Sequence, residues 1–322
     1  MRKTKKRESK FWILLLMVVV IIFAYNTKIA LNAQSLFSKI GDKAGSIPLL
    51  RVLSDSAVSV PLDNLNSSNA ILVRLDNHSV LMQKNSKQTI YPASLTKIMT
   101  AIVAIESLSD LQAKVALPNS LFQKLYKADA SMAGFIPDEK VRAIDLLYGV
   151  MLPSGAESCI GLADHIAGSE QKFVTIMNQK AVVLGMRNTH FTNSTGLQDD
   201  NHYTTVNDLS ILLSYALQNT TFRDIFTASR YSIAPTNKHP NGLTFQSTMF
   251  KNIENPMIDG GKILGGKTGY TVEAGLCLAS LAQKNGKEYI LVTAGAKDNH
   301  ESEQYNINDA YTVYNKLDTG TL

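Results

Sequence analysis

The sequence predicts an α/β plus all-α lobe architecture: an antiparallel sheet with flanking helices and an inserted helical subdomain. Strand-like runs rich in Val, Ile and Leu occur before residue 90 and return after residue 260. The block between them, about 105–255, carries apolar residues mostly at helical spacing. With 45% apolar and 18% charged residues among 322, the composition is that of a globular protein.

The first predicted elements are a hairpin and a helix. The apolar runs 70–75 and 80–83 are separated by the polar turn 76–79, which favours a β-hairpin. A helix is then expected from Ser94 to about Leu108. Because residues three apart lie on the same helix face, Lys97 is expected beside Ser94.

The helical subdomain is predicted from the spacing of apolar residues. The sequence indicates helices at 139–152, 158–165, 171–184 and 208–217. In the first of these, five apolar residues fall on one face: Val141, Ile144, Leu147, Tyr148 and Met151. Residues 205–207 are expected to cap the last helix.

The chain returns to the sheet after the helical subdomain. Residues 263–270 predict one strand, and residues 275–283 and 288–294 predict two more. The Asn285-Gly286 pair between the last two strands favours a tight hairpin turn. Helical spacing from Ile307 to Leu317 predicts a closing helix that packs on the sheet.

The positive charge of the chain is concentrated at its start. Residues 1–10 hold six basic side chains and one acidic one, so they account for the whole net charge of +5. The remainder of the chain is neutral. A basic nucleic-acid-binding face is therefore not expected, and no nucleic acid is predicted as a partner.

An apolar run follows this basic head. Residues 11–25 lack charges, and the apolar character extends to about residue 31. The run fits either a retained signal-anchor that crosses the membrane or the core of a cleaved signal peptide. We expect a cytoplasmic head at 1–10, an anchor at 11–31, a spacer at 32–68 and a catalytic domain at 69–322 outside the cytoplasm. If the run is cleaved, the domain is secreted.

Three short motifs carry the chemistry. Ser94-Leu95-Thr96-Lys97 places a hydroxyl and an amine on one helix face. Such a match alone is weak, and Ser169-Glu170-Gln171-Lys172 is a second one that we interpret as a helix cap. The first match is strengthened by Ser154-Gly155-Ala156 and by Lys267-Thr268-Gly269, which follow in that order.

This trio resembles the serine D-Ala-D-Ala carboxypeptidases, the low-molecular-mass penicillin-binding proteins of the serine β-lactamase/penicillin-binding superfamily. The similarity runs from about residue 70 to 294 and includes the stretch 184–197. The resemblance implies a serine β-lactamase/transpeptidase-like fold and no cofactor or metal. It also implies a peptidoglycan stem peptide ending in D-Ala-D-Ala as substrate, with β-lactams as covalent inhibitors.

The catalytic roles follow from the chemistry and the resemblance together. We expect Ser94 to be the nucleophile, activated by Lys97, although the proton acceptor is disputed in the superfamily. Ser154 is expected to relay a proton, and Lys267 to supply a second positive charge. The expected substrate-binding residues lie in one strand: Thr268 and Thr271 for the terminal carboxylate, Gly269 for close approach of the substrate backbone, and the Tyr270 amide for the oxyanion.

One motif departs from the family pattern. The second motif usually ends in Asn, where this chain has Ala156, and loss of the amide contact is expected to cost about 1–3 kcal/mol unless Glu157 or water fills the gap. Two other functions stay open: a β-lactamase, and a weakly active module that binds penicillin or wall peptide. Residues 181–198 contain no Glu or Asp to activate a deacylating water, which favours slow penicillin hydrolysis.

The remaining reactive side chains predict no second chemistry. Cys159 and Cys277 each lie in an apolar segment, and we interpret them as buried thiols. The six histidines show no H-E-x-x-H spacing, so a zinc peptidase is not expected. We interpret His190 and His202 as structural.

Overall fold

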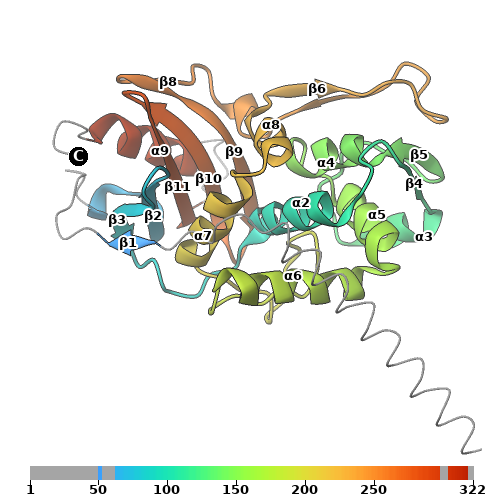
Figure 1. The fold of residues 1–322 in the computed structure, drawn as a ribbon, viewed down its shortest axis with the longest axis horizontal. Helices are drawn as coiled ribbons and strands as arrows, with labels where there is room; N and C mark the ends of the chain where they lie inside the picture. Colours follow the sequence, from blue (N-terminus) through green and yellow to red (C-terminus); the bar gives the residue numbers. More distant parts are fainter. Residues whose placement is uncertain (1–49, 53–61, 298–303, 318–322) are drawn as a thin grey trace, which may run out of the picture. The chain divides into compact units, whose positions relative to one another are not determined.

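A computed structural model describes residues 50–52, 62–297 and 304–317 of the chain. These residues form a large sheet and a helical lobe (Figure 1). The predicted head at 1–10 and anchor at 11–31 lie outside the described residues. Among the residues that are described, no helix has the length and apolar character needed to cross a membrane.

The large sheet contains the predicted strands. Its order is β1-β3-β2-β11-β10-β9-β8, and every neighbouring pair is antiparallel except β1 with β3. The bounds are β1 Arg51–Val52, β2 Asn69–Arg74, β3 Ser79–Lys84, β8 Met257–Ile258, β9 Gly261–Thr271, β10 Gly275–Lys284 and β11 Lys287–Ala296. The predicted Asn-Gly hairpin turn is confirmed, since Asn285 and Gly286 have φ values of 48° and 78°.

Both faces of the sheet are buried, and strand alternation divides the core in two. Ala70 and Leu72 of β2 face a cluster beneath α9 (Tyr305–Lys316). Ile71 and Val73 point to the opposite face, where they join the core of the helical lobe. The closing helix predicted from the sequence is therefore confirmed, and the sheet lies between α9 on one face and the helical lobe on the other.

The helices of the lobe surround the long buried helix α2. Their bounds are α2 Thr96–Ser107, α3 Asn119–Lys127, α4 Ala143–Met151, α5 Ala156–Ala167, α6 Glu170–Leu184, α7 Val206–Ala216 and α8 Thr220–Thr227. Both predicted caps are confirmed. The Ser169 side chain accepts a hydrogen bond from the Lys172 amide, and Thr205 accepts one from the Asp208 amide.

The prediction of a single helix over 139–152 is wrong in its first turn. Glu139–Arg142 is a strand, β5, that pairs with β4 (Lys114–Leu117), and α4 begins at Ala143. Val141 is buried in β5, so a strand residue happened to fit the helical spacing. Within so short a segment the alternation of two and the helical period cannot be distinguished.

The lobe also contains a second small sheet that the sequence did not predict. Strands β6 (Arg230–Ser232) and β7 (Thr244–Gln246) form a long hairpin beside α4 (Figure 1). Part of the predicted spacer at 32–68 belongs to the folded domain as well. The amides of Asn66 and Ser67 donate to the Asp309 carboxylate in α9, and β1 adds to the sheet edge.

A buried ion pair joins α6 to α2 within the lobe. Lys180 of α6 lies 2.7 Å from Glu106 of α2, and their side chains are 1% and 6% exposed. Lys180→Ala leaves the Glu106 carboxylate buried without its cation, so we expect unfolding free energy to fall by about 3–5 kcal/mol in urea denaturation. The control is Lys172→Ala, an exposed lysine of the same helix, for which the loss should stay within about 0.5 kcal/mol. Equal losses in the two variants would contradict the prediction.

Candidate active site

Ser94 lies on a tight turn immediately before α2. Residues Ala93–Leu95 form a 3-10 turn, η2, and α2 begins at Thr96, two residues after the expected helix start at Ser94. Ala93 has a left-handed backbone with φ of 46°, which strains a residue that has a Cβ. Lys97 Nζ lies 3.0 Å from Ser94 Oγ, so the predicted pair is in hydrogen-bonding contact.

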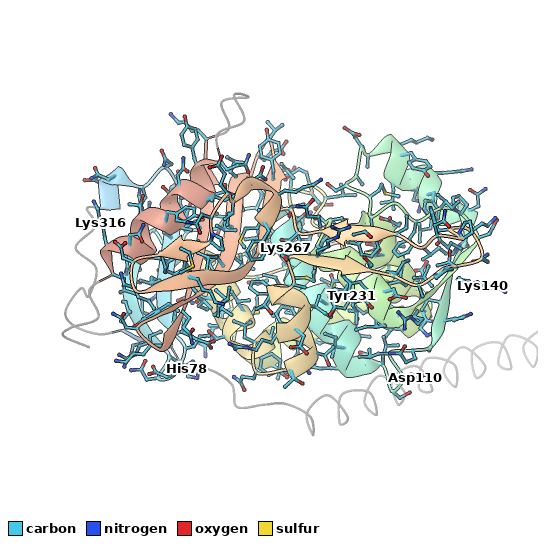
Figure 2. All side chains as sticks on the ribbon, turned by 90° about the horizontal axis from the view of Figure 1, so that it is seen from above. His78, Asp110, Lys140, Tyr231, Lys267 and Lys316 are labelled. Carbon is cyan, nitrogen blue, oxygen red and sulfur yellow. The ribbon has the colours of Figure 1, made fainter. Side chains whose placement is uncertain are left out.

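The second and third motifs meet at the same place. Lys267 Nζ donates to Ser154 Oγ at 3.0 Å and to the carbonyl of Thr268 at 2.8 Å. Ser154 also has a left-handed backbone, with φ of 67°. In Figure 2, Lys267 lies between the sheet side, marked by Lys316, and the helical side, marked by Lys140.

The two lysines are the dominant charges of the site. Lys97 is 2% exposed and Lys267 is fully buried. Burial lowers the pKa of the Lys97 amine, and burial together with repulsion from Lys97 lowers the pKa of Lys267 well below its usual value. Repulsion from Lys97 thus adds to burial in favouring the neutral amine of Lys267, and burial favours the neutral amine of Lys97.

Two other buried groups, Cys159 and Glu157, lie near the lysines, and the Glu157 carboxylate opposes the lowering of the Lys97 pKa. Burial raises the pKa of the Cys159 thiol to about 12, so Cys159 is not a thiolate partner for Lys97. Cys159 and Cys277 are both free and buried, as predicted. The described part of the chain contains no group of three or more His, Cys, Asp or Glu side chains arranged to hold a metal ion.

The predicted substrate-binding residues lie along β9. Thr268 Oγ1 is 2.6 Å from Thr248 Oγ1, a hydroxyl that sequence reasoning missed because its segment carries no motif. Tyr270 is partly exposed at the rim. Thr271 Oγ1 accepts a hydrogen bond from the Ala274 amide, so this residue also shapes the β9–β10 turn.

The glycine at position 269 is explained by packing within the protein and not by the expected close approach of the substrate backbone. A Cβ at this position would lie 3.0 Å from the Ser94 amide nitrogen and 3.3 Å from the Ala93 Cβ. The space above Gly269 is therefore filled by the η2 turn, not left open for substrate backbone. The glycine allows the strand to approach the nucleophile turn.

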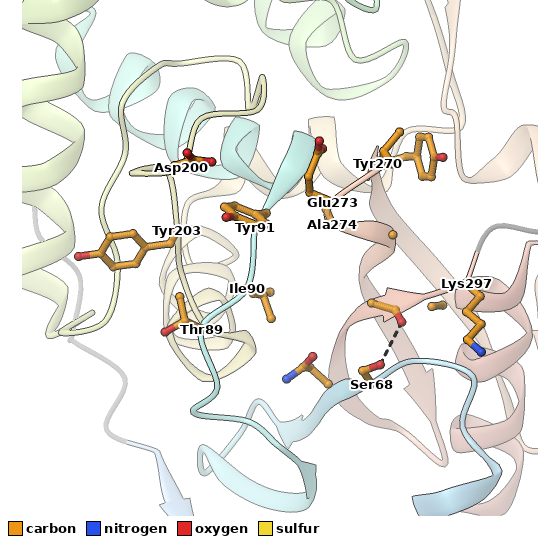
Figure 3. A pocket seen from close by; sticks show the side chains of 15 residues that line it. Ser68, Thr89, Ile90, Tyr91, Asp200, Tyr203, Tyr270, Glu273, Ala274 and Lys297 are labelled. Atoms are coloured by element: carbon orange, nitrogen blue, oxygen red, sulfur yellow. Dashed lines mark hydrogen bonds between the residues drawn. The ribbon is translucent and has the colours of Figure 1, made fainter.

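A cleft of about 410 Å³ opens in front of these groups. It is lined by Ser94, Lys97, Ala156 and the segments 128–131, 195–198 and 270–273. A larger hollow of about 760 Å³ lies on the other side of the β9–β10 turn and shares Tyr270, Val272 and Glu273 with the cleft (Figure 3). None of the side chains predicted to be catalytic lines this second hollow.

The loop 192–197 completes the site and was only partly anticipated. The Thr195 carbonyl accepts a hydrogen bond from Lys97 Nζ at 2.6 Å, and the Ser194 carbonyl accepts one from Thr100 Oγ1. This loop lies within the stretch that carried the family resemblance, but a carbonyl contact leaves no signature in residue type. Its backbone orients the Lys97 amine towards Ser94.

His202 fastens this loop to the catalytic helix. The Thr192 amide donates to His202 Nδ1, so Nε2 carries the proton and donates to Thr96 Oγ1 at 2.8 Å. Burial lowers the pKa of His202 to about 4, which keeps the ring neutral. The structural interpretation of this histidine agrees with these contacts.

Glu157 does not replace the missing Asn of the second motif. Its Oε1 accepts from the amides of Ala133, Gly134 and Phe135 at 2.7, 3.0 and 3.3 Å. The carboxylate is therefore committed to a neighbouring loop. Ala156 contributes only its methyl group and backbone to the cleft.

Comparison with known proteins places the chain in a family. The model for D-alanyl-D-alanine carboxypeptidases of the peptidase S11 family matches residues 55–298, and the chain belongs to this family. The D-alanyl-D-alanine carboxypeptidase DacF of Bacillus subtilis is 31% identical over 217 residues, which cover 67% of this chain and 54% of DacF. The chain thus spans about half the length of that relative.

The fold is shared with solved structures. The D-alanyl-D-alanine carboxypeptidase of Streptomyces strain K15 is 33% identical over 204 residues, covering 61% of this chain and 69% of that protein. The crystal structure of the Streptomyces K15 DD-transpeptidase superposes with a TM-score of 0.70 at 27% identity, covering 80% of this chain and 98% of that one. The predicted fold class is therefore confirmed.

The contact between Gly269 and the nucleophile turn provides a test of the geometry. Gly269→Ala forces the Ser94 turn to shift from β9 by a few tenths of an ångström, which should slow acylation of Ser94 by benzylpenicillin about tenfold. Stopped-flow labelling measures this rate. Gly168→Ala is the control for backbone strain away from the site: its φ of 78° should make the variant less stable, but a Cβ there meets nothing within 4 Å, so the acylation rate should stay unchanged. Acylation of Gly269→Ala at the wild-type rate would disprove the proposed constraint.

Proposed function

We propose that this chain is a serine D,D-carboxypeptidase that removes the terminal D-alanine from peptidoglycan stem peptides. The observation that carries the proposal is that Ser94 and Lys97 are hydrogen-bonded at the cleft, while Ser154 and Lys267 are hydrogen-bonded behind it, close enough for the two lysines to repel each other. Family membership supports the same reaction. The proposed steps are an acylation and a deacylation at Ser94.

Acylation begins with proton transfer from the Ser94 hydroxyl to neutral Lys97, 3.0 Å away. The serine oxygen attacks the carbonyl carbon of the penultimate D-alanine, and the amides of Ser94 and Tyr270 are proposed to hold the oxyanion. The C–N bond then breaks. The leaving amine takes its proton from the lysine pair through Ser154.

The substrate itself separates the roles of the two lysines. Its terminal carboxylate is proposed to bind at Lys267 and Thr268, with the Thr248 hydroxyl adjacent at 2.6 Å from Thr268 Oγ1. A carboxylate there favours the charged form of Lys267. That charge in turn favours the neutral form of Lys97, which the proton transfer requires.

Water completes the reaction by attacking the ester on Ser94 and releasing the shortened peptide. One related structure is described as a DD-transpeptidase, so an amine acceptor is a second possible nucleophile to include in assays. Residues 1–31 support a proposal about location as well. A basic head and an apolar run suit a single membrane anchor with the catalytic domain outside the cytoplasm.

The first test concerns the nucleophile. Ser94→Ala should abolish covalent labelling by a fluorescent penicillin and D-alanine release, while the thermal unfolding midpoint stays close to that of the wild type. Ser169→Ala, in the chain's other Ser-x-x-Lys match, should label normally. Retained labelling of Ser94→Ala would mean that another serine reacts.

The alternative functions are distinguished with the wild-type protein. Fast nitrocefin turnover would indicate a β-lactamase, and the absence of both nitrocefin turnover and D-alanine release would indicate a binding module.

The second test concerns the proton acceptor. Because burial lowers the pKa of Lys97, its neutral fraction and the acylation rate should rise as pH increases through that lowered pKa. Lys97→Arg keeps a cation but cannot become neutral, so acylation should fall roughly 10²–10⁴-fold. The pH–rate profile of the residual activity should lose this rise. An unchanged profile in Lys97→Arg would assign the base to another group.

A further inference from the structure

The helical-lobe wall of the cleft offers few groups to a bound peptide. The lobe lines the cleft with segment 128–131 and Ala156, and the sheet side lines it with residues 270–273. The only polar side chains of the lobe wall are Asp129 and Ser131, because the other lining residues there are alanines. Ser131 is exposed, and its hydroxyl makes no hydrogen bond within the described part of the chain.

The position of Ser131 is nevertheless fixed. Its carbonyl accepts a hydrogen bond from the Ala156 amide at 2.8 Å, at the start of the helix that follows Ser154. The next residues of the loop donate three amides to the fully buried Glu157 carboxylate. Hydrogen bonds to a charged acceptor are stronger than neutral ones, so the loop is anchored on the same helix turn as Ala156.

The anchoring is also tight in space. A Cβ on Gly155 would lie 2.6 Å from the Ala133 Cβ, so the loop and the second motif are in direct contact. Movement of Ser131 relative to Ser154 would therefore break both the Glu157 and the Ala156 contacts. A polar group held in this way is preorganised for a ligand.

A peptide in the cleft would need such a group. Beyond Lys262, the outer edge of β9 has no strand partner among the described residues. A substrate strand that pairs with this edge directs the N–H and C=O groups of one side at β9. The N–H and C=O groups of its other side face the helical-lobe wall. Unpaired amides buried there would weaken binding.

Ser131 suits both kinds of backbone group. Its hydroxyl can donate to a carbonyl and accept from an N–H, whereas the Asp129 carboxylate can only accept. The methyl group of Ala156 supplies neither function. The helical wall therefore depends on Ser131 for a neutral hydrogen bond to the substrate.

We propose that Ser131 is a substrate-binding residue that hydrogen-bonds the backbone amide of the acyl half of the substrate from the helical-lobe wall. This inference rests on the proposed function, because it assigns a contact within the same acylation reaction. It also explains how the cleft operates with Ala156 in its second motif. The contact lies beside the reacting carbonyl and leaves the proton transfers unchanged.

The experiment compares two β-lactams that differ in one amide. Benzylpenicillin carries an acylamino side chain that presents a carbonyl and an N–H, and 6-aminopenicillanic acid lacks that amide. Ser131→Ala should slow acylation of Ser94 by benzylpenicillin about tenfold, the effect of one lost hydrogen bond. Acylation by 6-aminopenicillanic acid should change less than about twofold. The control is Ser120→Ala, an exposed serine of α3, which should leave both rates unchanged.

A second variant supplies the missing amide. In an Ala156→Asn background, the new side chain should take over the contact, so the effect of Ser131→Ala should shrink to about threefold or less.

Equal slowing with both β-lactams would overturn the proposal, because it would indicate general distortion of the site. An unchanged benzylpenicillin rate in Ser131→Ala would overturn it as well. If wild-type protein neither reacts with benzylpenicillin at Ser94 nor releases D-alanine, the proposed function itself fails, and the inference falls with it.

Discussion

The close approach of three backbone segments around Ser94 is the constraint on which the site depends. Gly269 of β9 packs on one side of the η2 turn, where a Cβ would come within 3.0 Å of the Ser94 nitrogen. Gly196 packs on the other side, where a Cβ would come within 1.9 Å of the Ala93 carbonyl oxygen. Side chains at either position would separate the sheet from the helical lobe. The strained backbone of Ala93 is the local consequence, and it places the serine hydroxyl at the mouth of the cleft.

Charge repulsion inside this tight arrangement prepares the nucleophile. Two lysines that are almost fully buried cannot both stay charged without a large desolvation cost. The protein offers them hydroxyls and carbonyls instead of carboxylates: Ser94 and Thr195 for Lys97, and Ser154 and Thr268 for Lys267. A carboxylate at these positions would stabilise the ammonium form of Lys97 and remove the base. Among the described residues neither Lys97 nor Lys267 forms an ion pair, and this lack of a carboxylate partner is part of the chemistry.

The sequence predicted the longer strands of the large sheet, most of the helices and the pairing of Ser94 with Lys97, because these depend on periodicity and on motifs with fixed spacing. The hairpin turn at Asn285-Gly286 and the cap at Thr205 follow from local rules and agree with the structure. The strand at Glu139–Arg142 was missed because four residues cannot separate a period of two from a period of 3.6. Thr248 and Ser131 were missed for another reason: Thr248 reaches Thr268, and Ser131 reaches the cleft, through tertiary packing of loops that have no motif of their own. The role of Gly269 could be assigned only from the structure. A glycine that leaves room for substrate and a glycine that leaves room for a neighbouring turn look the same in the sequence.

Under the proposed function, the same set of groups serves both halves of the reaction, and this bears on how β-lactams would inhibit it. The carboxylates that line the cleft, Asp129 and Glu273, are exposed. Glu170, which follows the helix cap at Ser169, is occupied by the Ser194 amide and hydroxyl. Water that attacks the ester must therefore be activated from the side of Lys97 and Ser154.

With a peptide substrate, D-alanine leaves and opens that side. With a β-lactam, the leaving amine stays tethered to the acyl group through the opened ring, so it continues to occupy the space in front of Ser154 and Lys267. Acylation then proceeds with the same geometry for both ligands, and only the peptide clears the path for deacylation.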